Sequence, residues 1–177
     1  MPDHIKYLLT FASTPVFGTC DDETIEQFEA SLNVRLPEEY KEFLKVRNGT
    51  RFKSLLRFPV SEDYPADSGL WENLAVLFGL GDEHNHRSIV NQRSAYELSE
   101  RVPDWIVPIG ESGYRVFICL SCGDSDYGRI YAWKPESDWE DVNEQTYKYL
   151  YLAADSFSEF CLSLTVDEDD DEDVVDD

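Results

Sequence analysis

The chain has 177 residues, with 37 Asp or Glu against 15 Lys or Arg, and its formal net charge at pH 7 is −22. This charge argues against partners that are bound through their phosphates or anionic lipid, so we expect neither nucleic acid nor a membrane surface as a partner. A basic protein is the better candidate, because opposite fields steer association and raise its rate. The length fits one domain with a substantial core.

The first 20 residues precede the first helical pattern. The apolar run of residues 7–12 is short, follows little basic sequence and leads into no clear cleavage pattern. We therefore predict a strand or a packing segment here. No run of about 18 apolar residues occurs in the chain, so no membrane-spanning helix is expected.

A first amphipathic helix is predicted from apolar residues at i, i+3 and i+7, namely Ile25, Phe28 and Leu32. Pro37 is predicted to end this helix and to begin a second one, because its fixed φ is helical and a first turn does not need its N–H. Asn48-Gly49 should stop the second helix, since Gly readily adopts the left-handed conformation there. The N-cap of the first helix is left open between Thr19, Asp21 and Asp22. The apolar stripe of the second helix consists of Tyr40, Phe43 and Leu44.

Beyond residue 50 the pattern favours strands. We predict one strand or two short ones in residues 51–60, and a strand or a buried turn in residues 74–78. Three later apolar runs, separated by two tight Gly-containing connections, indicate an antiparallel meander over residues 106–109, 114–120 and 129–133.

Two more helices are expected, one from about residue 88 to residue 100 and one near the end of the chain. The last helix has apolar residues at i, i+3, i+4 and i+7, and Ser156 with Glu159 forms a capping-box pattern before it. The elements predict a single α+β domain over residues 1–166, with a mainly antiparallel sheet flanked by helices. Nine of the eleven residues in 167–177 are acidic, which predicts a disordered tail.

Several of these segments resemble one known family. The Ile-x-x-Phe-Glu pattern at Ile25, the sequence Leu36-Pro37-Glu38-Glu39-Tyr40, the Phe43-Leu44 pair and Asn48-Gly49 resemble the N-terminal signature of the SUKH superfamily, the Smi1/Knr4-like domains. The Pro-Ile-Gly-Glu-Ser-Gly turn of residues 108–113 and the terminal Ser-Phe-x-Glu-Phe helix are similar to later parts of that family. The likeness covers about residues 25–164 and is weakest between 50 and 85.

The resemblance implies a function as well as a fold. Bacterial and viral members of the family are mostly linked to immunity proteins, which bind and neutralise polymorphic toxins, many of them nucleases. Fungal members resemble scaffolds in cell-wall signalling. We therefore expect a non-catalytic immunity protein that occludes the active or substrate-binding surface of a cognate, basic toxin, with an intracellular regulatory scaffold as the alternative.

Motifs that could carry chemistry are weak in this sequence. Cys119 and Cys122 have C-x-x-C spacing but lie at the end of a predicted strand, whereas a thioredoxin-type pair opens a helix. His84 and His86 lie in an acidic loop, where solvated side chains are the simpler interpretation. We expect no cofactor and no metal. The four cysteines are interpreted as buried apolar residues in a reducing compartment, the cytoplasm.

The remaining candidates are surface loops. Loops 79–86, 123–128 and 135–143 are acidic, and aromatic residues adjoin two of them, as expected of a surface that binds a basic protein. The alternative is that they are ordinary solvated loops. The tail could likewise mimic a polyanion or serve only solubility. The candidate partner-binding residues are Asp82, Glu83, Asp124, Asp126, Tyr127, Asp138, Trp139, Glu140 and Asp141.

Overall fold

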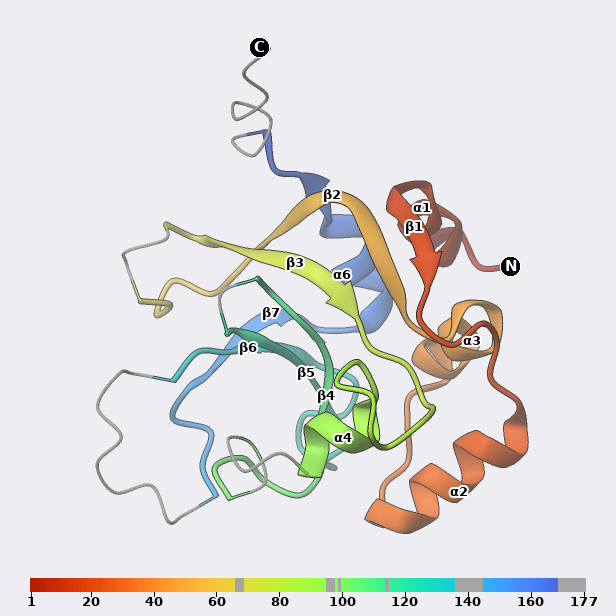
Figure 1. Ribbon diagram of the computed structural model, residues 1–177. Helices are drawn as coiled ribbons and strands as arrows, with labels where there is room; N and C mark the ends of the chain where they lie inside the picture. The colour runs from red at the N-terminus through yellow and green to blue at the C-terminus, as the bar shows by residue number, and fades with distance from the viewer. Residues whose placement is uncertain (66–68, 95–97, 99, 114, 136–144, 169–177) are drawn as a thin grey trace.

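One antiparallel sheet, with its strands in chain order, forms the centre of the molecule (Figure 1). The computed structural model describes residues 1–65, 69–94, 98, 100–113, 115–135 and 145–168. All strand pairings are antiparallel, which confirms the predicted meander and the α+β class. The strands are β1 (Ala12–Pro15), β2 (Thr50–Pro59), β3 (Trp71–Leu77), β4 (Ile106–Glu111), β5 (Phe117–Ser121), β6 (Ile130–Trp133), β7 (Leu150–Ala154) and the short β8 (Thr165–Val166), which pairs with β2.

The sheet is curled, so that its two ends approach each other. The backbone N–H of Ser61, just after β2, donates to the carbonyl of Leu152 in β7 at 2.9 Å. The rings of Tyr64 and Tyr151 meet at the same place, with centroids 5.1 Å apart. Both faces of the middle strands are covered, so every residue of β5 and β6 is buried.

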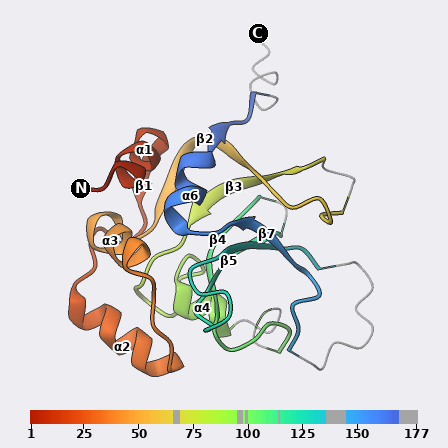
Figure 2. The same cartoon turned by 180° about the vertical axis from the view of Figure 1, so that it is seen from behind.

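Helices cover both faces of this sheet. Figures 1 and 2 show α6 (Phe157–Ser163) on one side and α4 (Ile89–Ser94) on the other. The helices α1 (Asp3–Phe11) and α3 (Glu38–Arg47) pack against α6, whereas α4 packs against β4. Aromatic rings fill the contact between α3 and α6: the Phe157 centroid lies 5.1 Å from Tyr40 and 5.6 Å from Phe43.

The N-terminal segment differs from the prediction. Residues 3–11 form helix α1, so of the two alternatives given for residues 7–12 the strand was wrong and the packing segment is confirmed. Ile5 and Leu8, which are three residues apart, are both fully buried and give the helix its inner face. The Tyr7 hydroxyl donates to the carbonyl of Leu164 at 3.0 Å and attaches α1 to the end of α6. The apolar pattern was too short for its period to be recognised.

Helix α2 (Asp22–Leu32) is the predicted first helix; its start settles the open choice of N-cap, and its end corrects a prediction. Its N-cap is Asp21, whose carboxylate accepts the backbone N–H of Thr24 at 2.8 Å. It ends at Asn33, in the left-handed conformation with φ of 52°, and not at Pro37 as predicted. Pro37 instead immediately precedes α3, in an extended conformation with ψ of 142°.

Asn48-Gly49 ends α3 as predicted, and it also connects three parts of the chain. The Asn48 side chain is buried; its amide donates to the Leu80 carbonyl at 2.6 Å, and its oxygen accepts the Leu80 N–H at 2.7 Å. Gly49 has a φ of +77°, and a Cβ there would stand 2.8 Å from the backbone nitrogen of Gly79. The close approach of residues 78–80 to the end of α3 therefore requires both Asn48 and Gly49.

The other predicted elements are found within the described residues. β2 and β3 confirm the strands expected on either side of residue 60. Helix α4 covers the start of the helix predicted for residues 88–100, of which residues 95–97 and 99 lie outside the described residues. Ser156 caps α6 by accepting the Glu159 N–H at 3.1 Å, and Glu159 accepts the N–H of Asp155. The tail residues 169–177 also lie outside the described residues.

Among the described residues, no helix combines the length and the apolar composition that crossing a membrane would require.

Substitution of Gly49 tests the close approach. Gly49→Ala should lower the free energy of unfolding by about 3 kcal/mol, because it adds both a strained positive φ and an overlap with Gly79. Gly18→Ala is the matched control: Gly18 has a φ of +86°, but nothing lies within 4 Å of its Cβ position. We expect it to cost only about 1 kcal/mol. Urea unfolding measures both values, and equal losses would show that the contact adds nothing.

Candidate protein-binding surface

The first acidic loop, residues 79–86, begins at the backbone segment that Asn48 holds. Asp82 and Glu83 are both exposed, as the sequence analysis expected of partner-binding residues. The Asp82 carboxylate accepts the backbone N–H of His84 at 2.9 Å, so Asp82 also shapes the loop. The amide of Asn91 donates to the Glu83 carbonyl at 2.8 Å and attaches the loop to α4. The loop therefore presents its carboxylates from a fixed backbone.

The second acidic loop, residues 123–128, is held at both ends. The N–H of Cys122 donates to the Trp105 carbonyl at 2.9 Å, and the N–H of Gly128 donates to the Ser121 carbonyl at 2.9 Å. Gly128 has a φ of +86°, which favours glycine at this turn. The loop thus connects β5 to β6 with little freedom of position.

Asp126 lies inside this second loop and is only 8% exposed. Its two carboxylate oxygens accept the Ser121 hydroxyl at 2.6 Å and the Tyr131 hydroxyl at 2.8 Å. Burial, together with the hydrogen bond to Asp126, raises the pKa of Tyr131 to about 12. Asp126 therefore organises the loop from within, and the expectation that it contacts a partner at the surface does not fit its burial.

Asp124 and Tyr127 project from the same loop. Asp124 is exposed, and the Tyr127 side chain is 46% exposed. Both line a surface hollow of about 490 Å³ between this loop and the end of α2, whose other walls include Asn33 and Arg35. This hollow brings together an aromatic ring, a carboxylate and a guanidinium from segments far apart in the sequence.

Two exposed aromatic residues beside this loop were missed by the sequence analysis. Trp105 is 42% exposed and Tyr147 is 37% exposed. The indole Nε1–H of Trp105 donates to the Tyr147 hydroxyl at 2.7 Å. Trp105 directly precedes the strand predicted for residues 106–109 and was not singled out from the sequence. The signal that could have identified it is the acidic residue just before it, Asp104, ahead of a buried strand.

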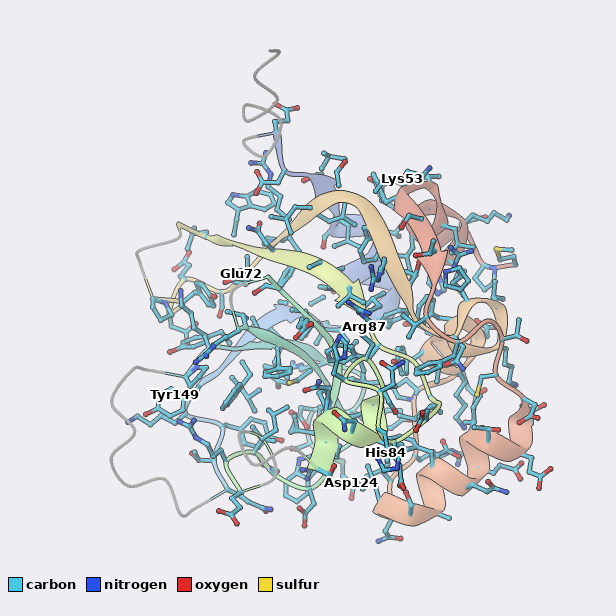
Figure 3. All side chains as sticks on the ribbon, viewed as in Figure 1. Lys53, Glu72, His84, Arg87, Asp124 and Tyr149 are labelled. Carbon is cyan, nitrogen blue, oxygen red and sulfur yellow. The ribbon has the colours of Figure 1, made fainter. Side chains whose placement is uncertain are left out.

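The two described acidic loops lie at the same end of the molecule. In Figure 3 the labelled residues His84 and Asp124 are both at the lower end, below the sheet. They face different sides: loop 79–86 is beside α4, towards the viewer in Figure 1, whereas loop 123–128 is in front in Figure 2. Four further candidates from the third loop lie outside the described residues, namely Asp138, Trp139, Glu140 and Asp141.

The cysteines are unpaired, and three of the four are buried. Burial raises the pKa of all four thiols, to about 11 for Cys20 and to about 12 for Cys122. Such thiols carry little thiolate at neutral pH and are poor nucleophiles and poor metal ligands. Within the described ranges, no three His, Cys, Asp or Glu side chains gather as a metal site would require.

Comparison with known proteins identifies the family. The model of the SMI1/KNR4 family (SUKH-1) matches residues 19–163. The chain belongs to this family. It is also 30% identical over 168 residues to the SPbeta prophage-derived uncharacterized protein YokK of Bacillus subtilis (strain 168), a match that covers 88% of this chain and 80% of YokK.

A solved structure supports the fold. A crystal structure of a protein from Pseudomonas syringae pv. tomato superposes with a TM-score of 0.51 at 17% identity, covering 81% of this chain and 93% of the other. At this identity the likeness concerns the fold alone. The SMI1/KNR4 match spans both of the described acidic loops, so the candidate surface lies within the family domain.

Asp124 and Asp126 give a paired test, because one is an exposed carboxylate and the other a buried structural carboxylate of the same loop. Asp126→Ala should lower the free energy of unfolding by about 1–3 kcal/mol, because the Ser121 and Tyr131 hydroxyls lose their acceptor. Asp124→Ala removes the same side chain from an exposed position and should change the free energy of unfolding by less than about 0.5 kcal/mol. Urea denaturation compares the two variants. Equal stabilities would contradict the structural role of Asp126.

The thiols give a second test. At pH 7.5 we expect the folded protein to react with a disulfide reagent such as DTNB at least about tenfold more slowly than the unfolded chain, because burial suppresses the thiolates. In denaturing urea all four cysteines should react at once. Rapid loss of two thiols from the folded protein would instead indicate a reactive Cys119–Cys122 pair.

Proposed function

We propose that this protein is a non-catalytic immunity protein, which binds a cognate polymorphic toxin and occludes its active or substrate-binding surface. The observation that carries the proposal is membership of the SMI1/KNR4 family, to which immunity proteins belong. The likeness to a prophage-derived relative is consistent with the proposal. The four unpaired cysteines support a cytoplasmic site of action.

The surface supports binding by contact and charge. Asp82 and Glu83 are exposed on one loop and Asp124 on the other, both with hydrogen-bonded backbones. Tyr127 and Trp105 supply exposed rings beside the second loop. Aromatic rings contribute buried area in an interface, and carboxylates pair with Lys and Arg of a partner. The proposed partner is therefore a basic toxin, bound without chemical change to either protein.

Co-expression tests the proposal directly. The chain is produced together with the product of the adjacent gene, captured by an affinity tag, and assayed for restoration of growth. A stable complex and restored growth would establish the immunity function and reveal the class of toxin. A neighbour without toxicity, together with capture of an unrelated cellular protein, would favour the regulatory scaffold instead.

Salt dependence tests the electrostatic part of the mechanism. Raising NaCl from about 0.05 M to about 0.5 M should lower the association rate constant about tenfold or more, because screening removes the steering field. The dissociation rate constant should change much less. Surface plasmon resonance or stopped-flow fluorescence measures both constants. An association rate that is indifferent to salt would contradict charge complementarity with a basic partner.

A further inference from the structure

The exposed pair Trp105 and Tyr147 is held rigidly in place. The Trp105 Nε1–H donates to the Tyr147 hydroxyl at 2.7 Å, and the Trp105 carbonyl accepts the N–H of Cys122 at 2.9 Å. The Tyr147 ring packs edge-on against Tyr131, with centroids 6.1 Å apart. An exposed side chain usually loses rotational freedom when a partner binds, whereas these two are already held by a hydrogen bond and by packing.

Gly123 makes room for this arrangement. A Cβ on Gly123 would stand 2.5 Å from Cδ1 and 2.6 Å from Nε1 of Trp105. The same point is 3.1 Å from Oδ1 of Asp126, so the indole and the carboxylate meet across this glycine. Any side chain at residue 123 would displace the indole. Gly123 is thus a positioning residue for Trp105.

A buried carboxylate lies close to the two rings and has no direct ion-pair partner among the described residues. Asp126 is 8% exposed, and its carboxylate is satisfied by the hydroxyls of Ser121 and Tyr131. Within the described residues no Lys or Arg forms an ion pair with it. Arg129, which lies close to the Tyr131 hydroxyl, is ion-paired with Asp155 at 3.0 Å and not with Asp126. The charge of Asp126 therefore acts on the adjacent rings, and Tyr147 is among the groups that it influences.

The neighbouring acid is already oriented. Arg93 is 7% exposed and donates to the Asp104 carboxylate at 3.1 Å, and the Gln145 side chain donates to the same oxygen at 2.8 Å. Asp104 itself is exposed and directly precedes Trp105. The buried guanidinium of Arg93 therefore fixes the position of Asp104 next to Trp105.

The faces of aromatic rings attract cations, and the attraction increases when a negative charge lies nearby. Elsewhere in the molecule another exposed ring already holds such a cation. Trp71, which is 44% exposed, has the Arg57 guanidinium 5.1 Å from its ring centroid. No Lys or Arg of the described part of the chain lies over Trp105.

We propose that Trp105 and Tyr147, above the buried Asp126 carboxylate, form a receptor for a Lys or Arg side chain of a basic protein partner. This inference rests on the proposed function and specifies the face and the anchor through which the partner binds. The aromatic faces supply contact area, Asp126 supplies the field from below, and Asp104 borders the site at the rim. The chosen occupant is a protein side chain, because the net charge of −22 repels polyanions.

Two exposed tryptophans provide a matched test in the complex with the captured partner. Trp105→Ala should weaken binding about tenfold or more, as expected for an anchor in a desolvated contact. Trp71→Ala removes an equally exposed ring that is already occupied by Arg57, and should weaken binding by less than about threefold. Gly123→Ala should reproduce part of the Trp105→Ala loss without removing any side chain. Equal effects of the two tryptophan changes would overturn the inference while leaving the proposed function intact.

A second measurement stands independently of any toxin. Short peptides are titrated into the ¹⁵N-labelled protein, one containing two arginines and a control with citrulline in their place, and the indole N–H signals are followed. The Trp105 signal should shift with the arginine peptide only, and the Trp71 signal should not. Asp126→Asn should reduce that shift. A Trp105 signal that is unmoved, or that responds equally to citrulline, would refute the receptor even if co-expression confirmed the immunity function.

Discussion

The buried contact between Asn48-Gly49 and residues 78–80 determines how the rest of the molecule is arranged. Asn48 pairs with both backbone groups of Leu80 through its side chain, and its own N–H donates to the Gly18 carbonyl at 2.9 Å. Its carbonyl accepts the N–H of Phe17 at 3.1 Å. One residue thus connects the N-terminal segment, the end of α3, the start of β2 and the segment after β3. Since each of these hydrogen bonds satisfies a backbone donor or acceptor, leaving those groups unpaired inside the protein would be costly.

Two glutamates of the N-terminal signature have a similar role between helices. Glu29 accepts the N–H of Leu36 at 2.7 Å and pairs with Lys41 at 2.9 Å, which fixes the turn between α2 and α3. Glu39 accepts the N–H of Ser158 at 2.9 Å, so a residue of α3 satisfies a free donor in the first turn of α6. The dipole of α3 favours an acidic residue in its first turn, but this is only part of the reason for Glu39. The other part is the hydrogen bond to Ser158, which joins the N-terminal and C-terminal parts of the family signature.

These contacts show what a single sequence can predict. Helix periods, the glycine after α3 and the apolar strands are local signals, so α2, α3 and the meander follow from spacing alone. Burial of a polar residue is not local. Asp124 and Asp126 have the same side chain two residues apart, yet only Asp126 turns inward, because Ser121 and Tyr131 lie on adjacent strands that come together in the fold. Trp105 was missed for the same reason, since its partner Tyr147 is 42 residues away.

The buried acids also connect the interior with the proposed function. Glu72 and Asp126 are the buried carboxylates among the described residues, and each accepts a tyrosine hydroxyl, from Tyr64 and Tyr131 respectively. A hydroxyl satisfies the lone pairs of a carboxylate but does not cancel its charge. With only 15 Lys and Arg in the chain, few cations remain for such positions, and the buried Arg93 pairs with another acid, Asp104. The negative field therefore extends from the core to the surface, where Asp124 and Asp104 reinforce it at the same end of the sheet. A partner that brings its own cations would complete pairings that the chain leaves incomplete, and this is a physical reason for an acidic protein of this fold to bind a basic one.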